Sequence, residues 1–186
     1  AVEVRGPDAI ESGVPRYGSE GAVKPMTEEQ KAEMRVKIAK DVLLRLKSGE
    51  IIARTNLWLN VTTSRKIRAG QSARSVLKKA ESCEACAMGA MFVADQRLNN
   101  GYKFEMFFGP SKDISIGGWH TFLHEDSLIR YFSQNQLSLI EGCFENRNEY
   151  PYAAKYKSNS KPRVRMNAIM RNIIRNKGTF VPAQDV

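Results

Sequence analysis

The sequence SCEACAMGAMFVADQRL, residues 82–98, is the longest run of this chain with almost no polar interruption. Apolar and small residues recur in steps of three and four from Ala73 to Leu98, which predicts one helix beginning near Ser72. Its second half is apolar on nearly every side, so we expect neighbouring elements to bury it. Gly89 costs roughly 1 kcal/mol inside a helix, and close packing is the expected compensation. This stretch is the predicted centre of the core.

Further helices are predicted on both sides of it. Thr27 and Gln30 match a capping box, and Gly49 matches a C-terminal stop. A second capping box is predicted at Ser133 and Gln136. The helices expected from these signals and from apolar spacing are 27–48, 125–132, 133–144 and 163–177. Two strands are expected at 56–61 and 102–108.

These elements predict a mainly α protein, a compact multi-helix domain with a minor two- or three-stranded β element. We expect a single domain over 27–182. Residues 1–26, rich in glycine and proline without a hydrophobic period, predict an extended or flexible N-terminal arm.

The composition favours a cytoplasmic protein. No apolar run approaches the ~20 residues that span a bilayer, and the N-terminus lacks a signal-peptide pattern. Three cysteines, an odd and small number, fit a reducing compartment. We therefore expect no membrane partner.

The net charge of +9 is unevenly distributed. Residues 51–80 contain seven basic and no acidic residues, and 151–186 contain eight basic residues and one acidic residue, whereas 81–150 carry a net negative charge. One interpretation is a surface that binds nucleic acid or an acidic protein; the alternative is that basic and acidic segments complement each other within the fold or an assembly. The candidate anion-binding residues are Arg65, Lys66, Arg68, Arg74, Lys78, Lys79, Arg163, Arg165, Arg171 and Arg175.

Cys83 and Cys86 form the sharpest local motif, since a helix would place both sulfurs near one side. His120 and His124 have a matching spacing, and the four side chains together would supply a tetrahedral structural zinc site. The alternative is that the cysteines are buried thiols, with Cys143 a further candidate. A zinc deaminase would require a proline directly before Cys83 and a His-x-Glu motif earlier in the chain, and the sequence has neither.

Signatures of common enzymes are missing from the sequence: it has no Walker loop, no GxGxxG and no GxSxG. His124, Glu125 and Asp126 could form an acid–base cluster, but acidic residues also favour the first turn of a helix. A non-enzymatic protein is the favoured interpretation.

Three segments, CEACAMGAMF, YFSQNQLSLIEGCFE and RMNAIMRNIIRNKGTFVP, resemble small uncharacterised proteins of tailed bacteriophages and their bacterial hosts, over roughly residues 30–182. The resemblance implies a phage-associated accessory role, in the host cytoplasm or with the virion, and no activity. The predicted function is a phage-like accessory binding protein whose basic surfaces engage an anionic partner. Alternatives are a component of a homo-oligomer or larger assembly, with the arm docked on a neighbouring subunit, and a small enzyme with an unrecognised site.

Overall fold

The computed structural model describes residues 24–64, 70–99, 113–116, 127–146, 156 and 161–185. Several predictions concern residues outside these ranges: most of the arm, the strand at 102–108, and the candidate residues Arg65, Lys66, Arg68, His120 and His124.

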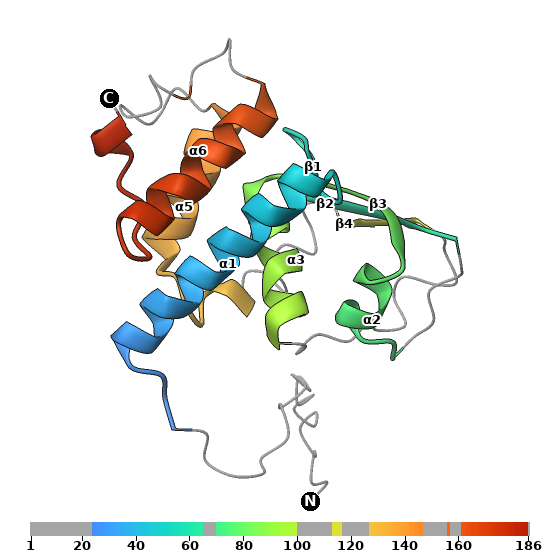
Figure 1. Cartoon of the computed structure of the whole chain (residues 1–186), viewed down its shortest axis with the longest axis horizontal. Coiled ribbons are helices and arrows are strands. Elements are labelled where there is room, and N and C mark those ends of the chain that lie inside the picture. The colour runs from blue at the N-terminus through green and yellow to red at the C-terminus, as the bar shows by residue number, and fades with distance from the viewer. Residues whose placement is uncertain are drawn as a thin grey trace, which may run out of the picture.

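The described part is mainly helical, as predicted. Its helices are α1 (Glu28–Ser48), α2 (Ala73–Leu77), α3 (Ala87–Asn99), α5 (Gln134–Glu145) and α6 (Pro162–Arg175), with a 3-10 turn, η3 (Pro182–Asp185). Figure 1 shows α1 crossing the middle of the molecule, with α5 and α6 on one side and α3, the sheet and α2 on the other. Buried side chains from these elements form a hydrophobic core that includes Ile38, Phe92, Phe144 and Ile169.

The predicted start and end of α1 are confirmed. The Thr27 hydroxyl accepts from the Gln30 amide, and the Gln30 side chain accepts from the Thr27 amide. Gly49 ends the helix in the left-handed conformation, with φ of 80°. Both local signals therefore determine where this helix begins and ends.

The minor β element is a four-stranded sheet in the order β1-β3-β2-β4. Its strands are β1 (Ile52–Ala53), β2 (Leu59–Thr63), β3 (Ala80–Ala85) and β4 (Asp113–Ile116). Strand β3 pairs parallel to β1 and antiparallel to β2, which also pairs antiparallel to β4. The strand expected at 56–61 corresponds to β2.

The single helix predicted from Ser72 is wrong. The structure divides this stretch into the short α2, the strand β3 and α3. In β3, the buried Cys83 and Ala85 alternate with the more exposed Ser82 and Glu84, as in a strand with one covered face. Pairing with strands on both sides of β3 overrides the helical spacing of the apolar residues in this part of the chain.

Two glycines permit close approach of the backbone. A Cβ at Gly89 would lie 1.9 Å from the carbonyl oxygen of Trp58, which confirms the close packing expected there. Gly178, with φ of 99°, follows α6, and a Cβ there would lie 2.6 Å from the carbonyl oxygen of Ala32. Any side chain at either position would therefore displace the neighbouring backbone.

The second predicted capping box is only half present. The Ser133 hydroxyl accepts from the Gln136 amide, as expected. The Gln136 side chain instead donates to the carbonyl of Phe180 at 3.0 Å and accepts from its amide at 2.7 Å. These two hydrogen bonds therefore join the C-terminal segment to the start of α5.

Candidate anion-binding site

The basic surface at α2 is formed by Arg74, Lys78 and Lys79. The Ser72 hydroxyl accepts from the Ser75 amide and caps α2, which fixes the backbone from which these side chains project. Arg74 is half-buried, and both lysines are exposed. The three cations and the two serines line an open cavity of about 390 Å³. No carboxylate lines this cavity among the described residues.

A second cavity, of about 430 Å³, shares Arg74 and Lys78 with the first. Four cationic and two anionic side chains line it: Arg45, Arg74, Lys78, Arg97, Glu50 and Glu81. They come from α1, α2, α3, strand β3 and the residues that directly follow α1 and α2. The lining carries a formal excess of two positive charges, which the ion pair of Arg45 with Asp41, at 3.5 Å, reduces to one.

Glu50 is the principal counter-charge in this second cavity. Its carboxylate accepts from Arg97 Nη1 at 2.9 Å and from Arg45 Nη1 at 2.8 Å. The hydrogen bond from Arg97 is the largest effect on the pKa of Glu50, and with those from Arg45 and Ser48 it outweighs partial burial and lowers the pKa to about 2. Glu50 is therefore ionised at neutral pH and neutralises only part of the surrounding charge.

Three guanidinium groups that line this cavity have a buried Nε atom without a hydrogen bond among the described residues, and that of Arg45 lies 3.5 Å from Asp41 Oδ1 in an ion pair. The Nε atoms of Arg74 and Arg97 are buried, and neither has a hydrogen-bond partner in the described part of the chain. A buried donor without a partner costs about 1–3 kcal/mol, and more when the group is charged. These Nε atoms have almost no accessible surface, so the cost is borne within the fold and is not relieved by a ligand in the open cavity.

The second basic segment includes α6, where the predicted site residues differ in their environment. Arg163 and Arg171 are exposed, and Arg175 forms an ion pair with Asp185. Arg165 is only 6% exposed: its Nε donates to the carbonyl of Phe144 at 2.8 Å, and its guanidinium lies 5.8 Å from that ring's centre. The prediction that Arg165 belongs to a binding surface is therefore wrong, because its charged group is committed to the interior.

Among the described residues, the basic side chains at α2 and those of α6 do not share one surface. In Figure 1, α2 lies at the right of the molecule and α6 at the upper left, with α1 and α3 between them. Of the predicted residues, the structure brings together Arg74, Lys78 and Lys79, and it adds Arg45 and Arg97. Sequence reasoning missed both of these arginines. Arg97 lies within the acidic middle segment, and its hydrogen bond to Glu50 joins residues 47 positions apart.

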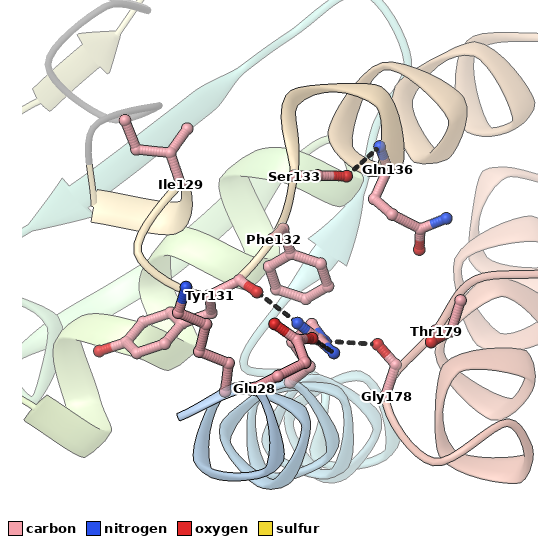
Figure 2. A pocket seen from close by; sticks show the side chains of 10 residues that line it. Glu28, Ile129, Tyr131, Phe132, Ser133, Gln136, Gly178 and Thr179 are labelled. Atoms are coloured by element: carbon pink, nitrogen blue, oxygen red, sulfur yellow. Dashed lines mark hydrogen bonds and ion pairs between the residues drawn. The ribbon is translucent and has the colours of Figure 1, made fainter. Parts of the chain in front are cut away.

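A third cavity, of about 270 Å³, lies between the start of α1, residues 129–136 and the Gly178 turn. The buried Arg35 donates to the carbonyls of Gly178 (2.7 Å) and Tyr131 (2.6 Å) and to Glu28 Oε1 (2.6 Å). Figure 2 shows Glu28, Tyr131 and Gly178 close together in this cavity, with dashed lines marking hydrogen bonds at Tyr131 and Gly178. Since these hydrogen bonds engage all three of its nitrogens, Arg35 serves to join three segments of the fold.

The cysteines do not have the geometry that the zinc hypothesis assumed. Cys83 lies on β3 and Cys86 just before α3, so the two are not on one helix. Both are buried, and burial raises the pKa of each thiol to about 12. No group of potential ligands converges among the described residues, but the two histidines lie outside them. The zinc site stays a prediction.

Comparison of the chain with protein-family models, with curated proteins and with solved structures finds no match. The resemblance to phage proteins therefore stays a prediction. Among the described helices, none has the length and apolar character needed to cross a bilayer.

Proposed function

We propose that this protein is a non-enzymatic binding protein that holds the phosphate backbone of a nucleic acid on the basic surface at α2. The observation that carries the proposal is the α2 cavity, lined by three cations and two hydroxyls. Protein contacts to phosphates come chiefly from arginine, lysine and hydroxyl side chains, the groups assembled here. An accessory role in a phage or its bacterial host, within the cytoplasm, is the setting that the sequence resemblance supports.

A linear polyanion fits the charge layout better than a folded acidic protein. Arg65, Lys66 and Arg68 shortly precede α2 in the sequence and extend the positive charge along the chain. A nucleic acid carries evenly spaced charges that a series of cations can follow. An acidic protein surface is the alternative, and the experiment below distinguishes the two.

The test is a binding titration with a fluorescent oligonucleotide, single- or double-stranded, at a series of salt concentrations. Affinity should fall steeply with salt because bound phosphates release counterions. A Lys78→Gln/Lys79→Gln variant should bind more weakly, and its plot of log affinity against log salt should be flatter by about 0.9 for each phosphate of duplex DNA that it no longer neutralises. Arg163→Gln/Arg171→Gln is the matched control, since it removes the same charge from α6.

The control separates the outcomes. A loss confined to the α2 variant supports the proposal. Equal losses in both variants would show a non-specific effect of net charge, and a loss confined to the α6 variant would move the site to that helix. If nucleic acid does not bind at low salt while polyglutamate does, the acidic-protein alternative replaces the proposal.

A further inference from the structure

Helices α1 and α6 pack against each other and run in opposite directions, as Figure 1 shows. The turn after α6 defines their alignment, because a Cβ at Gly178 would lie 2.6 Å from the carbonyl oxygen of Ala32 in α1. Arg35, about one turn further along α1, donates to the carbonyl of Gly178 at 2.7 Å. Helix α6 also contacts β1, the strand that follows α1. The first half of α6 therefore lies beside the second half of α1.

Two exposed aliphatic side chains lie at the same level of this helix pair. Leu44 on α1 is 57% exposed and Val164 on α6 is 56% exposed, the two highest values among the large hydrophobic side chains of the described residues. Val164 lies 14 positions before Gly178, and Leu46 lies 14 positions after Ala32, so Val164 is level with the last turns of α1. The axes of packed helices are about 8–10 Å apart, so one partner helix, about 10–12 Å in diameter, can contact both side chains.

The exposed side chains beside these two aliphatics are cationic. On α1 they flank Leu44 at spacings of four and three, which places them on its face of the helix. On α6 one directly precedes Val164 and another follows it by two turns. We call this surface the α1–α6 face, and its residues are Lys40, Leu44, Lys47, Arg163, Val164 and Arg171.

The carboxylates closest in sequence to this face are already paired. Helix α6 contains no acidic residue, and Asp41 is the one acidic residue in the second half of α1. Asp41 lies 3.5 Å from Arg45 in an ion pair, and Asp185, after α6, pairs with Arg175. Among the described residues, the α1–α6 face therefore keeps four exposed cations beside two exposed aliphatic side chains.

We propose that the α1–α6 face binds an acidic amphipathic helix of a protein partner. The apolar side of such a helix covers Leu44 and Val164, and its carboxylates pair with the surrounding lysines and arginines. This inference goes beyond the proposed function, since the face is formed by helices other than α2. It assigns the exposed arginines of α6 to a second partner, separate from the nucleic acid.

Other partners fit this face less well. The phosphate backbone of a nucleic acid would engage the cations, but it offers no apolar surface to Leu44 and Val164. A second copy of the chain would bring four positive charges against four. Helices that lie on a lipid surface use tryptophan, phenylalanine and leucine together, and the α1–α6 face has no aromatic side chain.

The test uses two peptides of ~20 residues, a length at which an isolated helix can form. Both contain glutamate, alanine and leucine in the same amounts. In one, the leucines recur at i, i+4 and i+7 and form a stripe, and in the other their order is scrambled. The amphipathic peptide should bind the full chain on the order of ten-fold tighter than its scrambled isomer, because it alone covers both aliphatic side chains.

A pair of aliphatic variants locates the apolar contact. Leu44→Gln/Val164→Gln should abolish the preference for the amphipathic peptide, and the residual charge attraction should be equal for both peptides. Leu98→Gln is the matched control, since Leu98 is an exposed aliphatic residue of α3, outside this face, and should retain the preference in full. Circular dichroism checks folding, and Leu44→Gln alone serves if the double variant does not fold.

A pair of charge variants locates the ionic contacts. Lys40→Gln/Arg171→Gln should weaken the binding of both peptides and reduce its dependence on salt. Lys78→Gln/Lys79→Gln removes the same charge beside α2 and should leave peptide binding unchanged. The amphipathic peptide should also bind in the presence of saturating oligonucleotide, because the two ligands occupy different surfaces.

Each outcome bears on one part of the inference. Equal binding of the two peptides, or no binding of either at low salt, overturns it. A preference that survives in folded Leu44→Gln/Val164→Gln, or that disappears in Leu98→Gln, overturns the assignment to this face. Binding of vesicles containing phosphatidylglycerol, without binding of either peptide, would replace the protein partner with a lipid surface. Loss of oligonucleotide binding alone would overturn the proposed function and leave this inference intact.

Discussion

The basic surface at α2 and the basic helix α6 look equivalent in the sequence but differ in what their charges touch. On α6, Arg165 is buried against Phe144 and Arg175 is paired with Asp185. At α2, the described residues offer Lys78 and Lys79 no carboxylate partner, and both are exposed. Part of the α6 charge therefore stabilises the fold, while the α2 charge is left for an external partner.

This difference shows that local charge density does not by itself identify a binding surface. An exposed cation without an ion-pair partner can form its hydrogen bonds and ion pairs with a ligand. A buried cation is already desolvated, and its donors are engaged by acceptors within the protein. The distinction predicts different responses to substitution: loss of stability at the buried Arg165 of α6, and loss of binding at the exposed lysines beside α2.

The largest effect is expected at Arg165. Arg165→Met removes the donor to the Phe144 carbonyl and the cation–π interaction with its ring, so the free energy of unfolding should fall by about 2–3 kcal/mol. Chemical denaturation at neutral pH measures this change in the free energy of unfolding. Arg171→Met, an exposed position on the same helix, is the control and should change stability by less than about 0.5 kcal/mol. Equal effects would contradict the interior role of Arg165.

A smaller loss is expected at Asp185, which accepts from Tyr156, Asn172 and Arg175. Burial alone would raise the pKa of Asp185, but these hydrogen bonds outweigh it and lower the pKa. A lowered pKa gives stability that is present above the ordinary value of about 3.9 and lost as the pH falls further. Asp185→Asn should therefore cost about 1–2 kcal/mol at pH 7.

The difference between wild type and Asp185→Asn should narrow below pH 4, as measured by urea unfolding across a pH series. Gln184→Ala, an exposed neighbour in η3, should leave both stability and its pH dependence unchanged. A constant difference from pH 7 to pH 2 would show that the carboxylate charge is not what holds this segment.

Local signals in the sequence predicted the elements that they control directly. The capping box at Thr27, the left-handed Gly49 and the apolar face of α6 gave helix positions close to those observed. The close approach at Gly89 was also predicted, since an apolar helix with a central glycine implies a near neighbour. These features depend on residues a few positions apart.

Features that depend on distant partners could not be predicted. Strand β3 has a short apolar spacing that fits helix or strand, and its pairing with β1 and β2 decides between them. The Gln136 side chain bonds to Phe180, 44 residues away, instead of completing a capping box. Of the candidate site, sequence supplied Arg74, Lys78 and Lys79 but not the guanidinium groups that α1 and α3 bring to them.

Substitution of Glu50, in the cavity beside α2, should have two modest effects: it should lower stability and strengthen oligonucleotide binding. The pKa of Glu50 is lowered to about 2, chiefly by the hydrogen bond from Arg97, so its stabilising contribution is lost as the pH falls from about 4.3 to about 2. Because the pair is partly exposed, Glu50→Gln should cost only about 1 kcal/mol at pH 7. The same change should tighten oligonucleotide binding, since it removes a competing anion.

The comparison for Glu50→Gln is Glu33→Gln, an exposed carboxylate on α1 outside the three cavities. It makes the same change in net charge and should alter affinity less. If both variants tighten binding equally, the gain comes from net charge and not from the cavity.

The smallest effect on stability is expected at Lys79, where the contrast with Arg165 is sharpest. Lys79→Gln should change the free energy of unfolding by less than about 0.5 kcal/mol, because the side chain is exposed and has no described ion-pair partner. Its oligonucleotide affinity should nevertheless fall, with a salt slope smaller by about 0.9 if Lys79 neutralises one duplex phosphate. Denaturation and salt-titrated binding on the same preparation give both quantities. A Lys79→Gln variant that loses stability but keeps its salt slope would place Lys79 with Arg165 among the structural cations and remove the difference between the two regions.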